Sequence, residues 1–389
     1  MSVQRVLFIT HAYPRHATDG AGSFLHRLAL ALTASGCEVR VLAPSGPQLP
    51  PTENLEGIEI RRFRYAPAGM ESLAYTGTMA EQVLGTLSGK GALLGMLTAG
   101  TMAVRRAVEE FRPDVVHAHW WFPAGLLALG ADSNVPLITT LHGSDVRLAR
   151  KVRLVHPLFK KVMARSAVVT AVSSWLAGEA RAMAPDTNIR VAPMPVDTIT
   201  FTDVSAQRIP GRFLFVGRLN EQKGLRHLLD ALAWCPQDTS LDVVGDGEEG
   251  SALRAHAQSL GIADRVYWLG QLGRSALPAL YHRAQAVVMP SVHEGLGLVA
   301  VEAQLSRTPV IAYRSGGLPD VVDPSWGGTL VPALDVRALA DAITRVHRDP
   351  GGVDTWGAAA RSVMVDRFAP SGVAAGYRAL YDAALQQPA

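Results

Sequence analysis

The feature that most constrains the fold is a series of short apolar runs, each followed by a turn and a helix-like stretch. In the first half of the chain these runs occupy residues 5–10, 38–44, 114–119, 136–143 and 167–173. Strand-length runs that alternate with helical patterns are typical of α/β proteins with parallel sheets. The sequence therefore predicts an α/β fold built from several strand–helix units.

The same series begins again in the second half of the chain. The segment "RFLFVGRLNEQKG" (212–224) predicts a strand that leads through a glycine loop. A helix is predicted to follow, because leucines recur at the spacing of one helical face. These leucines are Leu225, Leu228, Leu229 and Leu232. The proline-rich segment 191–201 lies between the two series and is interpreted as a linker.

Chain length and the repeated series together predict two domains. A chain of 389 residues is too long for one typical core. We predict two doubly wound, Rossmann-like domains that face a central cleft. The N-terminal domain would cover 1–195 and the C-terminal domain 196–371.

Composition excludes several classes of protein. A hydrophobic content of 48% with 18% charged residues is that of an ordinary globular protein and argues against disorder. The formal net charge of +3 is too small to predict a nucleic-acid partner. Cys37 and Cys235 lie far apart, which favours a reducing compartment over a disulfide or metal site. The first residues do not have the pattern of a signal peptide, so we expect a cytoplasmic protein.

Two glutamates stand eight positions apart in "PSVHEGLGLVAVEAQ" (290–304). Gly297 makes it unlikely that a helix has begun by Glu294, whereas Glu302 falls inside the helical pattern that follows. Such a spacing does not stack two carboxylates on one helix face. A glycine loop that leads into a helix N-terminus is an anion site. The segment therefore predicts a phosphate site flanked by two carboxylates.

Arg218 and Lys223 flank the glycine loop at the start of the second series. The chain contains no Asp-x-Asp sequence, so a bound diphosphate would need protein cations to neutralise its charge. Arginine offers a fork to phosphate oxygens and lysine a point charge. A solvated surface pair is the alternative. We predict that these two residues bind phosphate and that no metal ion or other cofactor takes part.

The first strand is followed by "DGAGSF", which contains Gly20 and Gly22. A nicotinamide-binding protein would carry an acidic residue at the end of the second strand. That end, at 42–46, has no carboxylate, so we do not favour a dinucleotide oxidoreductase. The glycines either permit a tight turn or let the backbone approach a ligand. We favour a ligand, because strand ends of open α/β sheets border the ligand crevice.

Several histidines lie on or after predicted strands. His117 and His119 alternate onto one face of a strand, but a zinc site would need a third ligand that the sequence does not place. His142 follows the strand "PLITTL" directly, with Gly143 and Asp145 behind it. A structural histidine with satisfied hydrogen bonds is one explanation of His142. We predict instead that it acts in the site, because loops at strand ends carry function.

The segment 147–165, "RLARKVRLVHPLFKKVMAR", contains seven Lys or Arg residues and no acid. Interleaved apolar residues make it an amphipathic basic stretch. A solvated face is the usual explanation of a charge run. Peripheral contact with an anionic membrane on its cytoplasmic face is the alternative, and the sequence does not choose between them.

Taken together, these motifs resemble a retaining glycosyltransferase of family 4 with the GT-B fold. The E-x7-E segment combined with G-R-L-x-x-x-K-G is a specific pattern. The matching segments occur in the order of the family and span most of the chain. They are "DGAGSF", "LHGSD", "VGRLNEQKG", "VVGDGEE", "SVHEGLGLVAVEAQ" and "PVIAYRSGGLPDVV".

The resemblance implies roles for residues of the second domain. Glu302 would bind the ribose hydroxyls of a nucleotide-sugar. The backbone N–H groups of Gly297 and Leu298 would contact its diphosphate, and Arg218 and Lys223 would neutralise the charge. The two glutamates are then a clamp for the donor and not an acid/base pair.

Further roles follow from the same resemblance. Glu294 and His142 would contact the donor sugar, while Gly20 and Gly22 would approach the transferred sugar and phosphate. A C-terminal helix, within 372–389, would pack on the first domain. The remaining candidates for substrate binding are Asp145, Gly245, Leu272 and Val299.

The function predicted in this way is a metal-independent hexosyltransferase that moves a sugar from a nucleotide-sugar to a hydroxyl with retention. A UDP-sugar is expected, with a guanosine nucleotide as the alternative, because base choice depends on backbone near Leu272. The acceptor would be a glycan, a glycolipid or a small molecule. A nucleotide-sugar epimerase and a non-catalytic binding protein are the other two hypotheses.

Some positions depart from the family pattern. Met194 and Pro195 replace the usual Asn-Gly in the linker, and Asp320 replaces a glutamate. Arg307 stands where a glycine commonly ends the helix after E-x7-E. These departures concern the hinge and the turns and leave the predicted site residues unchanged.

Overall fold

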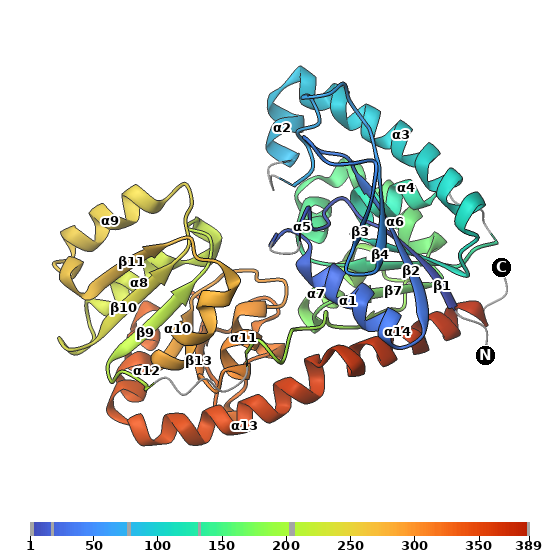
Figure 1. Ribbon diagram of the computed structural model, residues 1–389. Coiled ribbons are helices and arrows are strands. Elements are labelled where there is room, and N and C mark those ends of the chain that lie inside the picture. The colour runs from blue at the N-terminus through green and yellow to red at the C-terminus, as the bar shows by residue number, and fades with distance from the viewer. Residues whose placement is uncertain (1–3, 17–18, 76–78, 131–133, 202–206, 387–389) are drawn as a thin grey trace. The chain divides into compact units, whose positions relative to one another are not determined.

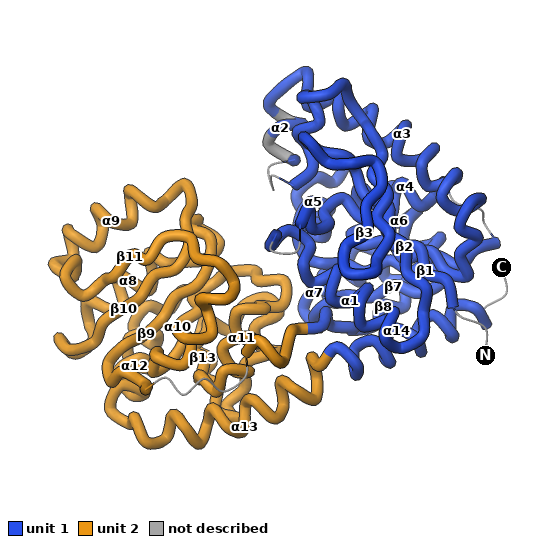
Figure 2. Tube along the Cα trace, viewed as in Figure 1, with its two compact units in different colours: residues 1–195, 370–389 blue, residues 196–369 orange. Residues whose placement is uncertain are grey.

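The computed structural model describes residues 4–16, 19–75, 79–130, 134–201 and 207–386. It divides into two compact units (Figure 2). Unit 1 comprises Met1–Pro195 with Pro370–Ala389, and unit 2 comprises Val196–Ala369. Each unit has its own sheet with helices around it (Figure 1), which confirms the α/β class predicted from the sequence.

Unit 1 contains an eight-stranded sheet in the order β3-β4-β2-β1-β5-β6-β7-β8. Neighbouring strands are parallel except for β3 and β4, which form an antiparallel hairpin at one edge. The strands are β1 (Gln4–Ile9), β2 (Cys37–Pro44), β3 (Thr52–Leu55), β4 (Ile58–Phe63), β5 (Val115–His119), β6 (Leu137–Leu141), β7 (Val168–Ala171) and β8 (Ile189–Val191).

Helices cover both faces of this sheet. On one face, Leu7 and Val116 of the sheet pack with Met96 and Val104 of α3. On the other face, α14 packs against α1 and against β5, where Tyr381 of α14 contacts His117. The helices of unit 1 are α1 (Ser23–Ala34), α2 (Met79–Gly85), α3 (Leu87–Phe111), α4 (Leu126–Ala128), α5 (Ser144–Lys151), α6 (His156–Arg165), α7 (Ser174–Met183) and α14 (Pro370–Leu385).

Unit 2 contains a six-stranded parallel sheet in the order β11-β10-β9-β12-β13-β14. This is the strand order of a doubly wound Rossmann sheet. The strands are β9 (Arg212–Val216), β10 (Ser240–Val244), β11 (Val266–Gly270), β12 (Ala286–Met289), β13 (Val310–Tyr313) and β14 (Thr329–Val331).

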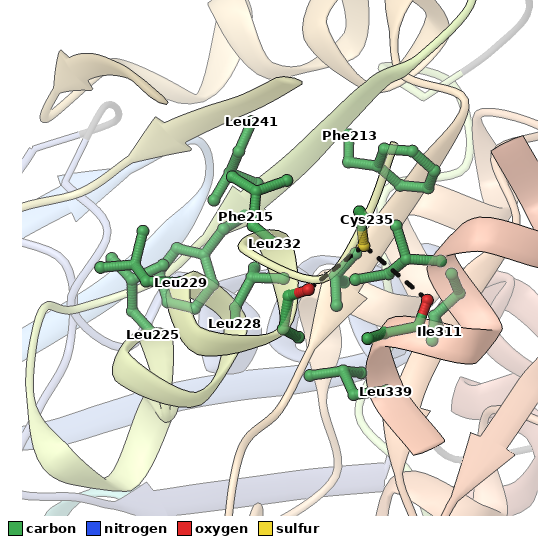
Figure 3. Close-up of a cluster of buried hydrophobic side chains, with 14 of the residues drawn as sticks. Phe213, Phe215, Leu225, Leu228, Leu229, Leu232, Cys235, Leu241, Ile311 and Leu339 are labelled. Atoms are coloured by element: carbon green, nitrogen blue, oxygen red, sulfur yellow. Dashed lines mark hydrogen bonds between the residues drawn. The ribbon is translucent and has the colours of Figure 1, made fainter. Parts of the chain in front are cut away.

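An apolar cluster joins the sheet of unit 2 to its helices (Figure 3). Leu228 and Leu232 of α8 pack against Phe213 and Phe215 of β9. The thiol of Cys235 is buried there and donates to backbone oxygens, so it acts as a core residue. The helices are α8 (Leu225–Leu232), α9 (Gly250–Ser259), α10 (Leu277–Arg283), α11 (Leu298–Leu305), α12 (Val336–Arg348) and α13 (Pro350–Phe368).

The strand order reverses once in each sheet. In unit 1 the reversal lies between β1 and β5, and in unit 2 it lies between β9 and β12. Open α/β sheets bind ligands outside the carboxyl ends of the strands at such a point, because the loops there diverge. The loops that follow these four strands are therefore the places where a site is expected.

Candidate active site

Backbone contacts fix the loop that follows β9. A Cβ atom at Gly245, where φ is 133°, would lie 1.8 Å from the carbonyl oxygen of Gly217. One at Gly247 would lie 2.4 Å from the oxygen of Leu219. Glycine is thus required where the loops after β9 and β10 touch. Between the two points of contact, Arg218 is exposed at the carboxyl end of the sheet.

The end of this loop lies against the loop that follows β12. The side chain of Asn220 accepts a hydrogen bond from the backbone N–H of Lys223 at 3.2 Å. Gly224 then adopts a left-handed conformation, with φ of 67°. A Cβ atom there would lie 2.2 Å from the oxygen of Pro290. The two loops on either side of the sheet reversal are therefore in direct contact.

This contact brings two of the predicted site residues together. Nζ of Lys223 lies 2.6 Å from Oε2 of Glu294, and the two side chains are 23% and 15% exposed. An ammonium group has three donors, so Lys223 can bind Glu294 and still donate to a phosphate. The carboxylate fixes the position of the cation and offsets part of its charge.

Helix α11 begins directly after this pair. The backbone oxygen of Glu294 accepts from the N–H of Gly317 at 2.8 Å, which anchors the loop. Gly297 has φ of 91° and is the residue before the helix. The first N–H groups of a helix, here of Leu298 and Val299, have no partner within the helix, and the helix dipole favours an anion there. Lysine and helix N-terminus together suit a phosphate.

Glu302 lies in α11 and is only 7% exposed. Nη2 of Arg274 lies 2.9 Å from its Oε1, and the hydroxyl of Tyr281 donates to its Oε2 at 3.1 Å. Burial, reinforced by Glu302, raises the pKa of Tyr281, so that its hydroxyl stays protonated. Arg274 follows Leu272, which is exposed. Glu302 is therefore a fixed carboxylate with two partners that the sequence did not predict.

In unit 1, Asp145 organises the loop that follows β6. Its carboxylate accepts from the backbone N–H groups of His142 at 3.2 Å, Gly143 at 2.9 Å and Trp121 at 3.1 Å. Asp145 is 2% exposed, and burial raises the pKa of its carboxyl group. These contacts make Asp145 a positioning residue for His142. The direct substrate contact predicted for Asp145 stays a prediction.

His142 lies in a cluster of rings at the end of the sheet. Its ring centre is 4.4 Å from that of Trp120 and 5.2 Å from that of Phe24. Nδ1 of His119, the last residue of β5, lies 3.2 Å from Nε2 of His142. Burial lowers the pKa of His142 well below its usual range. The ring of His142 is therefore neutral at pH 7.

The histidine pair on β5 has the orientation predicted from the sequence, on one face of the strand. Nδ1 of His117 lies 2.9 Å from the hydroxyl of Tyr381, and its Nε2 lies 2.7 Å from Oγ1 of Thr140. Both ring nitrogens of His117 thus bind protein groups. Among the described residues, no three His, Cys, Asp or Glu side chains are grouped so that they could hold a metal ion.

The two glycines after β1 differ. A Cβ atom at Gly22, where φ is 70°, would lie 2.5 Å from the oxygen of Ala12, so glycine is required there. Gly20 is exposed, and a Cβ atom would meet nothing within 4 Å. Packing therefore explains Gly22 and does not explain Gly20.

The basic stretch 147–165 folds into the end of α5, a short 3-10 turn and α6. Phe159, Val162 and Met163 are buried, whereas Leu154 is 90% exposed and Leu158 is 41% exposed. Exposed cations lie beside these two leucines. They include Lys151, Arg153, Lys160 and Lys161. None of the helices in the described ranges has the length and apolarity to cross a bilayer.

Comparison with known proteins identifies the family. The model of "Glycosyltransferase Family 4" matches residues 18–199, and that of "Glycosyl transferases group 1" matches residues 206–363. The chain is 30% identical to a glycogen synthase of Mycobacterium tuberculosis, over 98% of this chain and 95% of that protein. The chain belongs to glycosyltransferase family 4. It is therefore a glycosyltransferase.

Solved structures confirm the GT-B fold. Sucrose-phosphate synthase from Thermosynechococcus elongatus superposes with a TM-score of 0.80 at 24% identity, covering 97% of this chain and 98% of that one. HepE from Anabaena, solved in complex with UDP-glucose, has a TM-score of 0.71 at 19% identity and covers 97% and 99% of the two chains.

In this glycosyltransferase, several predicted residues of unit 2 gather at the sheet reversal, whereas Gly245 and Leu272 follow β10 and β11. Lys223, Glu294 and the start of α11 are joined there by contacts of loop backbone and side chain. Sequence reasoning missed Arg274 and Tyr281, the partners of Glu302. An arginine and a tyrosine outside any motif give no signal, because Tyr281 on α10 and Arg274 in the turn before it reach Glu302 only in the folded chain.

Sequence reasoning also missed two residues of the ring cluster in unit 1. His11 follows β1, and its ring centre is 4.4 Å from that of Trp120. Trp120 has a positive φ of 69°, which is rare for an aromatic residue. Backbone strain of this kind gathers at functional sites, but it is visible only in a structure.

Proposed function

We propose that this glycosyltransferase takes its sugar from a nucleoside diphosphate sugar bound by unit 2. The observation that carries the proposal is the ion pair of Lys223 and Glu294, at 2.6 Å, beside the N-terminus of α11. A cation and a helix N-terminus suit a diphosphate. Glu302, fixed by Arg274, offers a carboxylate to ribose hydroxyls.

The nucleotide in this proposal is uridine diphosphate. HepE, which shares the fold, has been solved with UDP-glucose, and this supports a UDP-sugar here. The exposed loop that contains Leu272 lies just before Arg274, the partner of Glu302. Its backbone groups would contact the base, next to the ribose. Guanosine diphosphate is the alternative nucleotide.

The reaction in this proposal is transfer with retention. The acceptor oxygen forms a bond to the anomeric carbon on the side from which the diphosphate leaves. The bond from that carbon to the phosphate oxygen breaks, and this oxygen takes the proton of the acceptor hydroxyl. Both glutamates are held in ion pairs, Glu294 with Lys223 and Glu302 with Arg274. This supports a reaction in which neither carboxylate acts as a nucleophile. The protein then contributes positioning and charge stabilisation.

Protein cations replace a metal ion in this account. Arg218 and Lys223 would neutralise the leaving diphosphate, so turnover of the donor should continue unchanged in EDTA. Strict dependence on added Mg²⁺ or Mn²⁺ would show that these two side chains are not sufficient.

A thermal-shift panel tests the donor. Purified protein is heated with UDP-, GDP- and dTDP-sugars, beside the Glu302→Ala variant as a control. A ligand present at 100 times its Kd stabilises a protein by about 2.7 kcal/mol. We expect a UDP-sugar to raise the Tm of the wild type more than that of the variant. Equal shifts in both proteins, or none with any nucleotide-sugar, would contradict the proposal.

The acceptor in this proposal is a hydroxyl of a glycan, as the name of the glycogen synthase relative suggests. A glycolipid or a small molecule is the alternative. Release of nucleotide that depends on added acceptor identifies transfer. A nucleotide-sugar epimerase would instead convert the donor without an acceptor and form a second nucleotide-sugar.

We also propose peripheral contact between segment 147–165 and an anionic membrane. The nearly fully exposed Leu154 beside Lys151 and Arg153 is the supporting observation, because apolar side chains flanked by cations suit a lipid interface. Wild type should sediment with phosphatidylglycerol vesicles and dissociate at high salt. Leu154→Glu should weaken this binding, and Ile199→Glu, at an exposed residue outside the segment, should not. Equal binding to neutral vesicles, or no binding, would contradict this contact.

A further inference from the structure

His119 and His142 share one hydrogen bond at the end of the sheet of unit 1. Their nitrogens, Nδ1 of His119 and Nε2 of His142, are 3.2 Å apart. His119 is fully buried between the rings of Phe8 and His117, at 4.7 Å and 4.1 Å. His142 is only partly buried. Its other nitrogen, Nδ1, is therefore the one available to a ligand.

One proton lies between the two nitrogens, because burial lowers the pKa of both rings well below its usual range. Either Nδ1–H of His119 donates to His142, or Nε2–H of His142 donates to His119. A neutral imidazole carries only one N–H. The direction of this hydrogen bond therefore also decides whether the second nitrogen of each ring carries a proton.

The second nitrogen of His119 distinguishes the two arrangements. Nε2 of His119 is buried, and within the described part of the chain it has no hydrogen-bond partner. If His142 were the donor, this nitrogen would carry a buried proton without an acceptor. Orphaned buried N–H groups are rarer in proteins than under-satisfied acceptors. The arrangement in which His119 donates leaves only a lone pair there.

We propose that His119 is a positioning residue that holds His142 as the Nδ1–H tautomer. His142 then donates a hydrogen bond from Nδ1 to an uncharged oxygen of the transferred sugar. In that form it can act neither as a cation nor as a base through this nitrogen. The inference rests on the proposed function and on the expectation, implied by the family resemblance, that His142 contacts the donor sugar, and it assigns His119 a role that none of the motifs suggested.

Nitrogen-15 NMR of histidine-labelled protein tests the proton arrangement without any substrate. The chain contains 12 histidines, and the signals of His119 and His142 are assigned by their loss in His119→Asn and His142→Ala. We expect His142 to show a protonated Nδ1 and an unprotonated Nε2, and His119 to show the same tautomer. A protonated Nε2 on His142 would overturn the proposal.

Two substitutions of His119 test its effect on transfer. Asparagine places an amide N–H near the position of Nδ1, whereas leucine has a similar size and no donor. We expect His119→Leu to lower kcat/KM by about tenfold, the scale of one hydrogen bond, and His119→Asn to retain most of the activity. Urea unfolding of both variants shows whether they fold. Equal decreases of kcat/KM in two folded variants, or no decrease in His119→Leu, would overturn the positioning role.

The two measurements also separate this inference from the proposed function. Absence of transfer from every nucleotide-sugar would contradict the proposed function and leave the NMR result standing. Transfer that depends on His142, together with an Nε2–H tautomer, would contradict the inference and leave the function standing. Wild-type transfer by His142→Ala would overturn the sugar contact and with it the role of His119.

Discussion

The carboxyl ends of the two sheets carry opposite kinds of chemistry. In unit 2, charged side chains form ion pairs, Lys223 with Glu294 and Arg274 with Glu302. In unit 1, the corresponding sheet reversal carries neutral rings, because burial lowers the pKa of His142 and His119 well below the usual range.

The contrast suggests a division of labour between the two halves of the chain. Paired charges that are partly exposed suit a charged ligand such as a diphosphate, whereas neutral donors and acceptors suit the hydroxyls of a sugar. Lys223 and Glu294 in unit 2, and His119 in unit 1, belong to or follow strands that flank the sheet reversal, so the same topology positions two different chemistries.

The largest effect is expected from the cation of unit 2. Lys223→Ala should lower kcat by about 10²- to 10³-fold, the scale for losing one preorganised charge-stabilising donor. The variant also leaves the carboxylate of Glu294 without its partner. The double variant Lys223→Ala/Glu294→Ala should therefore lose less than the product of the two single losses. If steady-state kinetics showed that the double variant loses kcat by the full product of the two single losses, Lys223 and Glu294 would not be coupled in the reaction.

Glycines at close backbone contacts should matter in both units. Gly245→Ala places a Cβ atom 1.8 Å from a carbonyl oxygen, and Gly22→Ala places one at 2.5 Å. Each should destabilise its unit by about 1–3 kcal/mol. Gly351→Ala and Gly20→Ala are the matched controls, because a Cβ atom there meets nothing within 4 Å. Urea unfolding measures the stabilities. A control variant that lost as much stability as the close-contact variant of the same unit would show that the backbone contact is not the cause.

Acid should destabilise unit 1 through its buried histidines. Burial lowers the pKa of His117 to about 3 and that of His11 to about 4, from 6.5. Below pH 6.5 the unfolded chain binds protons that the folded state does not. The free energy of unfolding therefore has its full value above pH 6.5. It falls as the pH drops toward 4, by about 1.4 kcal/mol per pH unit for each histidine.

Hydrogen exchange of peptides from β5 and β6, measured between pH 7 and pH 5 and corrected for the intrinsic pH dependence, checks this expectation. Protection should decrease as pH falls, and His117→Gln should reduce the slope. A slope that is unchanged in this variant would show that His117 does not cause the acid sensitivity.

A smaller effect is expected for the partner of Glu302. Arg274→Ala should raise the donor KM by about tenfold with little change in kcat, because Glu302 loses one of the groups that fix its carboxylate. Arg254→Ala is the control, since Arg254 lies within helix α9 and its guanidinium is 4.5 Å from the ring of Trp268 on β11, not beside Glu302. An unchanged KM for Arg274→Ala would mean that Tyr281 alone positions Glu302.

The sequence predicted the strands that carry the site but missed the edge hairpin of β3 and β4. The turn between these strands has positive φ at Glu56 and Gly57, which is the geometry of a two-residue hairpin. Its strands are short and largely polar on one side, so they gave little apolar signal. Arg307 also takes a positive φ of 56°, the conformation that a glycine would favour at that turn.

Individual site residues were predictable where a motif brings them together in sequence. Glu294, Gly297 and Glu302 lie in one segment, and their pattern indicates an anion site without a structure. The partners of these residues were not predictable in the same way. Arg274 reaches Glu302, and His119 reaches His142, across long distances in the chain, and such contacts are set by packing.

Steady-state kinetics of Glu302→Ala beside Lys223→Ala tests the central claim most directly, with acceptor-dependent release of nucleotide as the readout. Ribose does not change during the reaction, so Glu302→Ala should mainly raise the donor KM. The diphosphate gains charge as the glycosidic bond breaks, so Lys223→Ala should mainly lower kcat. If Lys223→Ala changed only KM while Glu302→Ala abolished kcat, the two roles would be reversed, and Glu302 would be a catalytic carboxylate.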